Sequence, residues 1–257
     1  MKAAATHGKR VVILDRPNPI GGMVQGNILD MAYATAVGRL AIPMRHGMTL
    51  GEMALLAKAD LGLTTDVRVI PVAGWWRNQS YDVLDLPFVR PSPNLASLEA
   101  LYHYPGTCLF EGTAYSVGRG TTEAFMQVGA PWLDTATVRK RLEAAKVPGV
   151  RFESVRFTPT SPGDGKFADT TLAGIRFHLT DAHRYDPTRA TVELLVALQA
   201  VHPDRWGWNV RHFDRLAGTA SLREQVTAGA RAEAILRAWR EPREAFLARR
   251  TPFLLYR

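Results

Sequence analysis

The sequence is poor in cysteine and has no long apolar run. Cys108 is the only cysteine, so no disulfide can form within the chain, and its apolar neighbours indicate a buried thiol rather than a nucleophile. No apolar run approaches the ~20 residues that a membrane helix needs. The first ten residues contain no apolar segment of the secretory kind, and the sequence leaves the cellular compartment open.

Acidic residues are also scarce, 24 against 32 basic ones, and the resulting net charge of +8 permits an anionic partner. Nucleic acid is the obvious candidate, but no helix-turn-helix, zinc finger or ribonucleoprotein motif is present. Arginines become denser only near the C-terminus, on a segment patterned as an amphipathic helix, where a solvated face explains them. We therefore expect no nucleic acid partner. We also expect no metal or other cofactor.

Four consecutive apolar residues, Val11–Leu14, predict a strand buried on both faces, as inside a parallel sheet. Two prolines and two glycines follow within Asp15–Gly22, so the strand ends in a rigid loop, at the edge where open α/β sheets bind ligands. A central strand needs neighbours, yet only ten residues precede this one. Either later segments supply all of these neighbours, or the chain begins partway through a domain.

Later segments complete an α/β pattern. Thr49 and Glu52 form a capping box that starts a helix, and Glu52 is assigned to that cap rather than to catalysis. Val67–Val72 and Thr107–Phe110 are predicted strands. The pattern of the sequence changes after Trp132. We predict a partial Rossmann-like parallel sheet over residues 1–135 and a smaller C-terminal α/β domain over residues 136–257.

Two loops near the first strand carry polar candidates. Asp15 and Asn18 lie in the proline-fixed loop, which holds a carboxylate and an amide at low entropic cost, although Asp15 would equally suit a local cap. Arg45 and His46 precede the capped helix and could bind an anion near its N-terminus. A structural arginine and a hydrogen-bonded histidine are the alternatives.

A third candidate loop, Gly118–Thr122, combines backbone amides, the Arg119 guanidinium and the Thr121 hydroxyl, which suits a carboxylate or phosphate. It is neither a dinucleotide fingerprint nor a P-loop, because the required glycines and lysine are absent. Glu111 could act in acid–base chemistry, and an ion pair with Arg119 or Arg16 is the alternative. These features indicate an anion-binding cleft without specifying a reaction.

Several motifs occur in one order along the chain: Asp15–Gly22, Pro43–Thr49, Pro91–Asn94, Tyr104–Thr107, Glu111–Thr122, Phe213–Gly218 and Pro252–Tyr256. Together they resemble the NamZ family of bacterial exo-β-N-acetylmuramidases. The resemblance implies a Rossmann-like N-terminal domain, a smaller C-terminal α/β domain and a cleft between them. It also implies the removal of terminal N-acetylmuramic acid from the non-reducing end of peptidoglycan fragments during cell-wall turnover.

The implied substrate suggests roles for the candidate residues. N-acetylmuramic acid carries a lactyl carboxylate, for which Arg45 or Arg119 is a suitable partner. Asp15, Asn18 and Asn94 would then suit the sugar hydroxyls or the acetamido group. Glycoside hydrolysis needs a proton donor and a group that stabilises or attacks the anomeric centre.

One departure from the family affects the expected catalytic acid. The family places this acid in a Glu-His-Gly motif, and the present sequence contains none. We therefore expect a truncated chain, barely active or inactive alone and marginally folded, whose main acid lies in a missing N-terminal half. Within the chain, Glu111 and Asp15 are the catalytic candidates. The alternative is a non-catalytic module that binds peptidoglycan or another carbohydrate.

Overall fold

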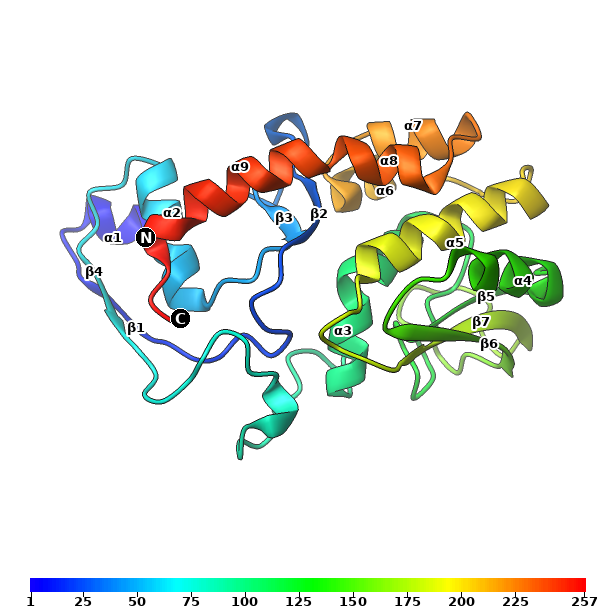
Figure 1. The fold of residues 1–257 in the computed structure, drawn as a ribbon, viewed down its shortest axis with the longest axis horizontal. Coiled ribbons are helices and arrows are strands. Elements are labelled where there is room, and N and C mark those ends of the chain that lie inside the picture. Colours follow the sequence, from blue (N-terminus) through cyan, green and yellow to red (C-terminus); the bar gives the residue numbers. More distant parts are fainter.

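The computed structural model describes all residues, 1–257. Both termini lie in one part of the molecule, at the left of Figure 1. This part contains α1 (Lys2–Thr6), β1 (Val11–Leu14), α2 (Leu50–Asp60) and β4 (Val67–Ile70). Strands β1 and β4 pair in parallel, with Val11 opposite Val67 and Leu14 opposite Ile70. The predicted parallel sheet is thus present, although it has two strands.

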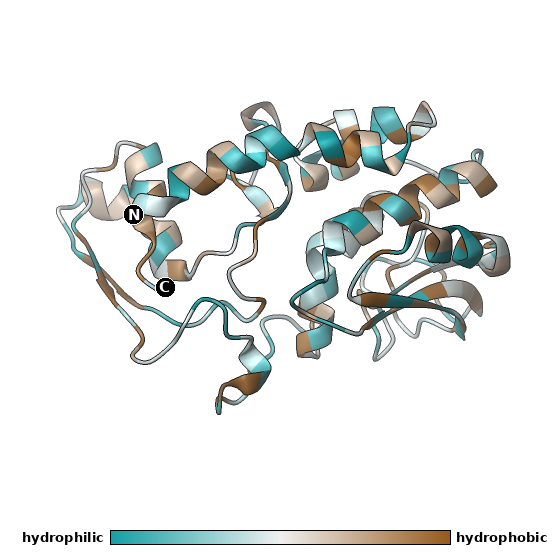
Figure 2. Cartoon of the chain, in the orientation of Figure 1, coloured by the Kyte–Doolittle hydropathy of each residue, from teal (hydrophilic) through white to brown (hydrophobic).

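The burial of β1 differs from the prediction of a strand covered on both faces. Helix α2 contacts β1 and β4, whereas Val12 and Leu14 are 53% and 76% exposed. Figure 2 shows apolar residues along both strands. Alternate side chains of a strand point to opposite faces, and only one face of this two-stranded sheet is covered. The prediction of burial was wrong because an apolar run indicates a strand but does not show which other elements cover its two faces.

A second small sheet joins this part to the rest of the molecule. Strand β2 (Gln25–Ile28) pairs antiparallel with β3 (Pro43–Arg45), which places Gln25 opposite Arg45. The connection between them contains the short 3₁₀ helix η1 (Met31–Tyr33), and a second one, η2 (Tyr81–Val83), lies in the long loop after β4. Strand β2 contacts both α5 and α9, so this sheet lies at the junction of the two parts.

The predicted strand Thr107–Phe110 is wrong, because the segment is helical. Helix α3 spans Leu98–Thr107 and continues directly into the 3₁₀ helix η3 (Cys108–Gly112). The hydroxyl of Ser97 caps α3 by accepting a hydrogen bond from the backbone N–H of Ala100. A short buried apolar run has the same composition in a strand and in a helix, so the pattern alone could not separate them.

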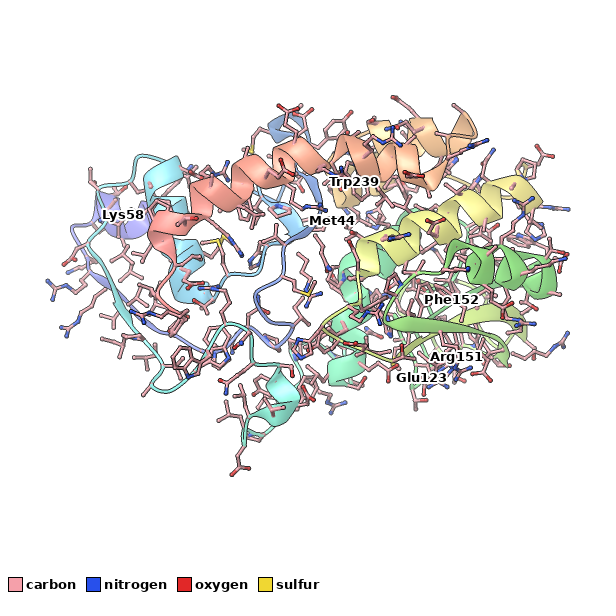
Figure 3. The ribbon with its side chains drawn as sticks, in the orientation of Figure 1. Met44, Lys58, Glu123, Arg151, Phe152 and Trp239 are labelled. Carbon is pink, nitrogen blue, oxygen red and sulfur yellow. The ribbon has the colours of Figure 1, made fainter.

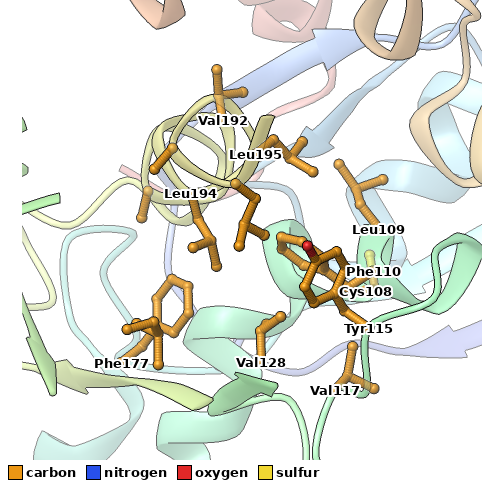
Figure 4. Packing of buried hydrophobic residues seen from close by; sticks show 14 of the residues in the cluster. Cys108, Leu109, Phe110, Tyr115, Val117, Val128, Phe177, Val192, Leu194 and Leu195 are labelled. Atoms are coloured by element: carbon orange, nitrogen blue, oxygen red, sulfur yellow. The ribbon is translucent and has the colours of Figure 1, made fainter. Parts of the chain in front are cut away.

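The main core lies in the other part, at the right of Figure 1. Its sheet has the antiparallel order β5-β7-β6, and α4 and α5 pack beside it. Figure 4 shows Val192, Leu194 and Leu195 of α5 packed in this core with Val128 and Phe177 of the sheet. The elements are β5 (Gln127–Ala130), α4 (Thr135–Ala145), β6 (Val150–Phe157), β7 (Leu172–Leu179) and α5 (Pro187–Val201).

The last helices lead back to the first part of the molecule. They are α6 (Val210–Ala217), α7 (Ser221–Thr227), α8 (Ala232–Ala238), α9 (Arg240–Arg250) and the 3₁₀ helix η4 (Thr251–Phe253). Helix α9 contacts β2, and η4 contacts α2. Contacts therefore cross the predicted boundary near residue 135, as does the pairing of β5 with β7. None of the helices combines the length and hydrophobicity that crossing a bilayer requires.

Candidate functional site

Asp15 connects three segments at the end of β1. Its Oδ1 accepts a hydrogen bond from the backbone N–H of Gly51 at 2.8 Å. Its Oδ2 accepts from the Thr49 hydroxyl at 2.6 Å and from the Tyr256 hydroxyl at 2.7 Å. Asp15 thus caps the first turn of α2 rather than local amides of its own turn, because its partners lie 34 or more positions away in the sequence. Its catalytic role stays a prediction.

Asn18 fixes the shape of the loop that follows. Its side-chain amide donates to the carbonyl of Met48 at 3.0 Å, and its Oδ1 accepts from the backbone N–H of Ile20 at 3.1 Å. The loop is therefore held against the segment that contains His46. This arrangement follows from the two flanking prolines, which restrict the backbone and leave the amide in one position.

A groove of about 460 Å³ lies between this loop, β3 and α3, and we call it the α3 groove. Its lining includes Asn18, Met44, His46, Tyr104, Cys108 and Arg215. Figure 3 shows Met44 between the two parts of the molecule. The structure thus brings the predicted residues Asn18 and His46 to one hollow, whose volume is within the usual range for a small ligand.

His46 is neutral in the folded protein at physiological pH. Its Nδ1 accepts a hydrogen bond from the backbone N–H of Met48 at 3.1 Å, which requires an unprotonated nitrogen. Burial, together with the nearby charge of Arg250 and partly opposed by Glu52, lowers the pKa of His46 from 6.5 to about 4. His46 therefore supplies a hydrogen-bonding imidazole rather than a positive charge.

This pKa shift predicts a pH-dependent stability. Between pH 6.5 and 4 the unfolded chain binds a proton at His46 and the folded chain does not, so the free energy of unfolding falls as the pH drops through this window. His46→Asn keeps an acceptor but has no titrating group. Urea unfolding at pH 7 and pH 4.5 should show a loss about 1–2 kcal/mol smaller in the variant than in the wild type. Equal losses would contradict the assignment.

Glu111 and Arg119 form an ion pair, one of the two interpretations that the sequence left open. The Glu111 Oε1 accepts from the Arg119 Nε at 2.9 Å and from its Nη2 at 2.5 Å. The Arg119 guanidinium lies 5.0 Å from the centroid of the Phe125 ring. Phe125 also packs edge-on against Tyr104, which lines the α3 groove. The ion pair therefore lies beside the groove, connected to it through Phe125.

The glycine-rich loop that carries Arg119 is fixed from within. The Thr121 hydroxyl donates to the carbonyl of Gly118 at 2.7 Å and accepts from the Gln127 Nε2 at 3.1 Å. Gly118 and Gly120 have φ values of +74° and +80°, which only glycine adopts without strain. Thr121 thus shapes the loop, and its predicted contact with substrate remains a prediction.

Lys166 supports the turn that bears Glu111, and the sequence analysis missed it. Its Nζ lies within hydrogen-bond distance of four backbone carbonyls, those of Phe110, Glu111, Thr113 and Tyr115, at 2.7–3.2 Å. Burial lowers the pKa of Lys166. No local signal identifies this role, because the four carbonyls lie more than 50 positions earlier in the chain.

Lys166→Met is expected to reduce the free energy of unfolding by about 2 kcal/mol, because several partly buried carbonyls lose their donor. Lys140→Met is the matched control, since Lys140 is exposed on α4 and should change stability by less than about 0.5 kcal/mol. Urea unfolding of both variants measures the difference. Equal stabilities would mean that water replaces the ammonium without cost.

Arg45 and His46 line different hollows. Its side chain is buried, and its Nη1 donates to the Gln25 Oε1 at 2.8 Å. It borders a second hollow of about 510 Å³, which we call the Arg45 cavity; Ile20 lines both this cavity and the α3 groove. Asn94, which is partly buried just before α3, lines neither hollow. The predicted site residues are thus distributed over several places.

Comparisons with known proteins agree on a family. The model of the exo-β-N-acetylmuramidase NamZ N-terminal domain matches residues 1–99, and the model of the C-terminal domain matches residues 102–256. The chain is 34% identical over 258 residues to the peptidoglycan β-N-acetylmuramidase NamZ of Bacillus subtilis. This alignment covers all of the chain and 62% of the length of the relative.

Two crystal structures of DUF1343 family proteins from Bacteroides fragilis have the same fold. One has a TM-score of 0.93 at 26% identity, and the other has 0.79 at 34% identity. In both cases all of the present chain is covered, together with 69% of the other chain. The predicted α/β fold class is confirmed. Because models of both domains match, the prediction of a missing N-terminal half gains no support.

Proposed function

Because the chain belongs to the NamZ family, we propose that it acts as an exo-β-N-acetylmuramidase. The reaction is the release of terminal N-acetylmuramic acid from the non-reducing end of peptidoglycan fragments, in cell-wall turnover. The observation that carries this proposal is the match of both NamZ domain models in order along the chain, together with the β-N-acetylmuramidase activity of the Bacillus subtilis relative.

The geometry beside the α3 groove supports glycoside hydrolysis. Arg119 contacts only the Oε1 atom of Glu111, so Oε2 is not part of the ion pair. A carboxylate in that position can accept a proton from water or stabilise positive charge at the anomeric centre. We propose this role for Glu111. Asp15 is the weaker candidate, since both of its oxygens already accept hydrogen bonds from the protein.

The α3 groove provides contacts for a sugar. Its volume is sufficient for one saccharide unit, and it has both apolar surface and polar groups from Asn18 and His46. We propose that these groups face the hydroxyls and the acetamido group. Arg119 and Thr121 would border the same sugar from the glycine-rich loop. Asn94 is a further candidate for contact with the substrate.

A second function, binding of peptidoglycan without turnover, is favoured by one observation. Both acidic candidates are engaged, Glu111 in an ion pair and Asp15 in three hydrogen bonds. A binding module needs the groove but no free acid. Analysis of the products distinguishes a binding module from an enzyme.

The test uses the native protein, isolated from its own cells through a tag placed after Arg257. It is incubated with a peptidoglycan tetrasaccharide that begins with N-acetylmuramic acid, and products are identified by mass spectrometry. Exo-hydrolysis predicts free N-acetylmuramic acid and a trisaccharide as the first products. Binding without any product would favour the second function, and internal cleavage into disaccharides would contradict the exo assignment.

A further inference from the structure

The Arg45 guanidinium carries a buried positive charge that forms no salt bridge and is only partly stabilised by the nearby carboxylate of Asp186. Its side chain is 3% exposed, and its hydrogen bonds go to neutral oxygens, the Gln25 Oε1 at 2.8 Å and the carbonyls of Tyr185 and Ile20. It takes part in no ion pair of this structure, whereas Arg77 and Arg119 pair with glutamates. A buried charge without a partner is costly, so an arrangement of this kind favours the binding of an anion.

The donors of Arg45 are only partly used. A guanidinium has five N–H groups, and the three hydrogen bonds of Arg45 leave at least two of them without an acceptor. The Nε atom is buried and has no partner. Elsewhere in the chain, Arg223 uses its Nε and Nη2 together to hold both oxygens of Asp214, at 2.8 Å each. The corresponding edge of Arg45 retains donors for a carboxylate.

The cavity beside Arg45 has the composition of an anion site. Its lining includes Arg45, Trp76, Gln79, Ser80, Tyr102 and His183, and none of its lining residues is acidic. Arg77 and Arg257 also border it. A negatively charged group that enters this cavity therefore meets basic and hydrogen-bonding side chains and no acidic side chain.

Trp76 adds an apolar surface at the mouth of the cavity. Its side chain is 53% exposed, whereas the adjacent Trp75 is buried against Tyr256. Residues Trp206 and Trp208, by contrast, stack on each other at 4.3 Å. Trp76 is thus an exposed indole that lines a hollow, which is the usual arrangement for contact with the flat or apolar part of a ligand.

We propose that the Arg45 cavity binds a carboxylate attached to an apolar or ring-shaped group, with the carboxylate at Arg45 and the rest of the ligand against Trp76. Binding of such a ligand depends only on the charge and the lining of the cavity. Its assignment to peptidoglycan fragments rests on the proposed function, and such fragments carry carboxylates both on the lactyl group of N-acetylmuramic acid and on their acidic peptides. The structure thereby favours Arg45 over Arg119, whose charge Glu111 already balances.

The experiment measures binding by calorimetry with three probes: N-acetylmuramic acid, N-acetylglucosamine and the dipeptide alanyl-glutamate. N-acetylglucosamine lacks the lactyl carboxylate and is expected not to bind at this cavity. Binding of N-acetylmuramic acid identifies the sugar acid as the source of the carboxylate, and binding of the dipeptide alone identifies the peptide. If neither acid binds, or if N-acetylglucosamine binds as tightly as the acids, the proposal is overturned.

Two variants locate the binding. Trp76→Ala should weaken binding of the acid about tenfold, because it removes the exposed indole without disturbing the core. Val89→Ala is the control, since Val89 is 79% exposed in the same loop and does not line the cavity. Arg45→Met should abolish binding if it folds. Unchanged affinity in Trp76→Ala would contradict the proposal.

These readouts are independent of hydrolysis. If the wild type releases N-acetylmuramic acid but Trp76→Ala binds the acid like the wild type, the proposed function stands and this inference fails. If the wild type releases no sugar but Trp76→Ala weakens carboxylate binding, this inference stands and the proposed function fails.

Discussion

Glu111→Gln is expected to lower the rate of N-acetylmuramic acid release by about 10²- to 10⁴-fold. Glutamine has nearly the same shape but can neither exchange a proton nor balance the charge of Arg119, with which Glu111 is paired. Release of sugar from a peptidoglycan disaccharide measures the rate. The carboxylate lies beside the α3 groove, so the change should affect the chemical step more than the stability of the fold.

The matched control for this prediction is Glu143→Gln. Glu143 also forms an ion pair, with Arg139, but this pair is exposed on α4. The control should therefore release sugar at the wild-type rate. A loss smaller than about threefold in Glu111→Gln would remove Glu111 from the chemistry and direct attention to Asp15.

Glu52→Ala is expected to reduce the free energy of unfolding by about 3–5 kcal/mol. Glu52 is fully buried and forms an ion pair with Arg77. It also accepts hydrogen bonds from the backbone N–H groups of Thr49 and Leu255, at 2.9 Å and 2.8 Å. Removing the carboxylate leaves the Arg77 guanidinium without a counter-ion and two backbone donors without partners, and it removes one of the bonds between the C-terminal segment and α2.

Urea unfolding followed by circular dichroism measures this loss. Glu244→Ala is the matched control, because Glu244 is exposed on α9 and should change stability by less than about 0.5 kcal/mol. The double variant Glu52→Ala/Arg77→Met should recover part of the loss, since it also removes the unpaired charge. A Glu52→Ala protein as stable as the control would mean that water enters and replaces the pair.

The features that the sequence predicted well are local ones. The capping box of Thr49 and Glu52 is present as expected, because its partners are three residues apart. The strands at Val11–Leu14 and Val67–Ile70 were also predicted, from the apolar composition of both segments, although their direct pairing was not. Asp186 caps α5 for the same local reason.

The features that the sequence did not predict depend on distant contacts. Helix and strand could not be separated at Thr107–Phe110, where the surrounding core determines the structure. The exposure of Leu14 depends on which neighbours cover β1. Nothing near Lys166 in the sequence indicates that its ammonium group binds the turn of Glu111. The candidate site could be named residue by residue, but its division between the α3 groove and the Arg45 cavity required the structure.

The central claim is tested most directly by a pair of chromogenic sugars. The native protein is assayed on 4-nitrophenyl β-N-acetylmuraminide and on 4-nitrophenyl β-N-acetylglucosaminide, which differ only in the lactyl group. An exo-β-N-acetylmuramidase should turn over the muraminide with a kcat/KM at least about 100-fold above that of the glucosaminide. Equal turnover of both sugars, or turnover of the glucosaminide alone, would contradict this claim.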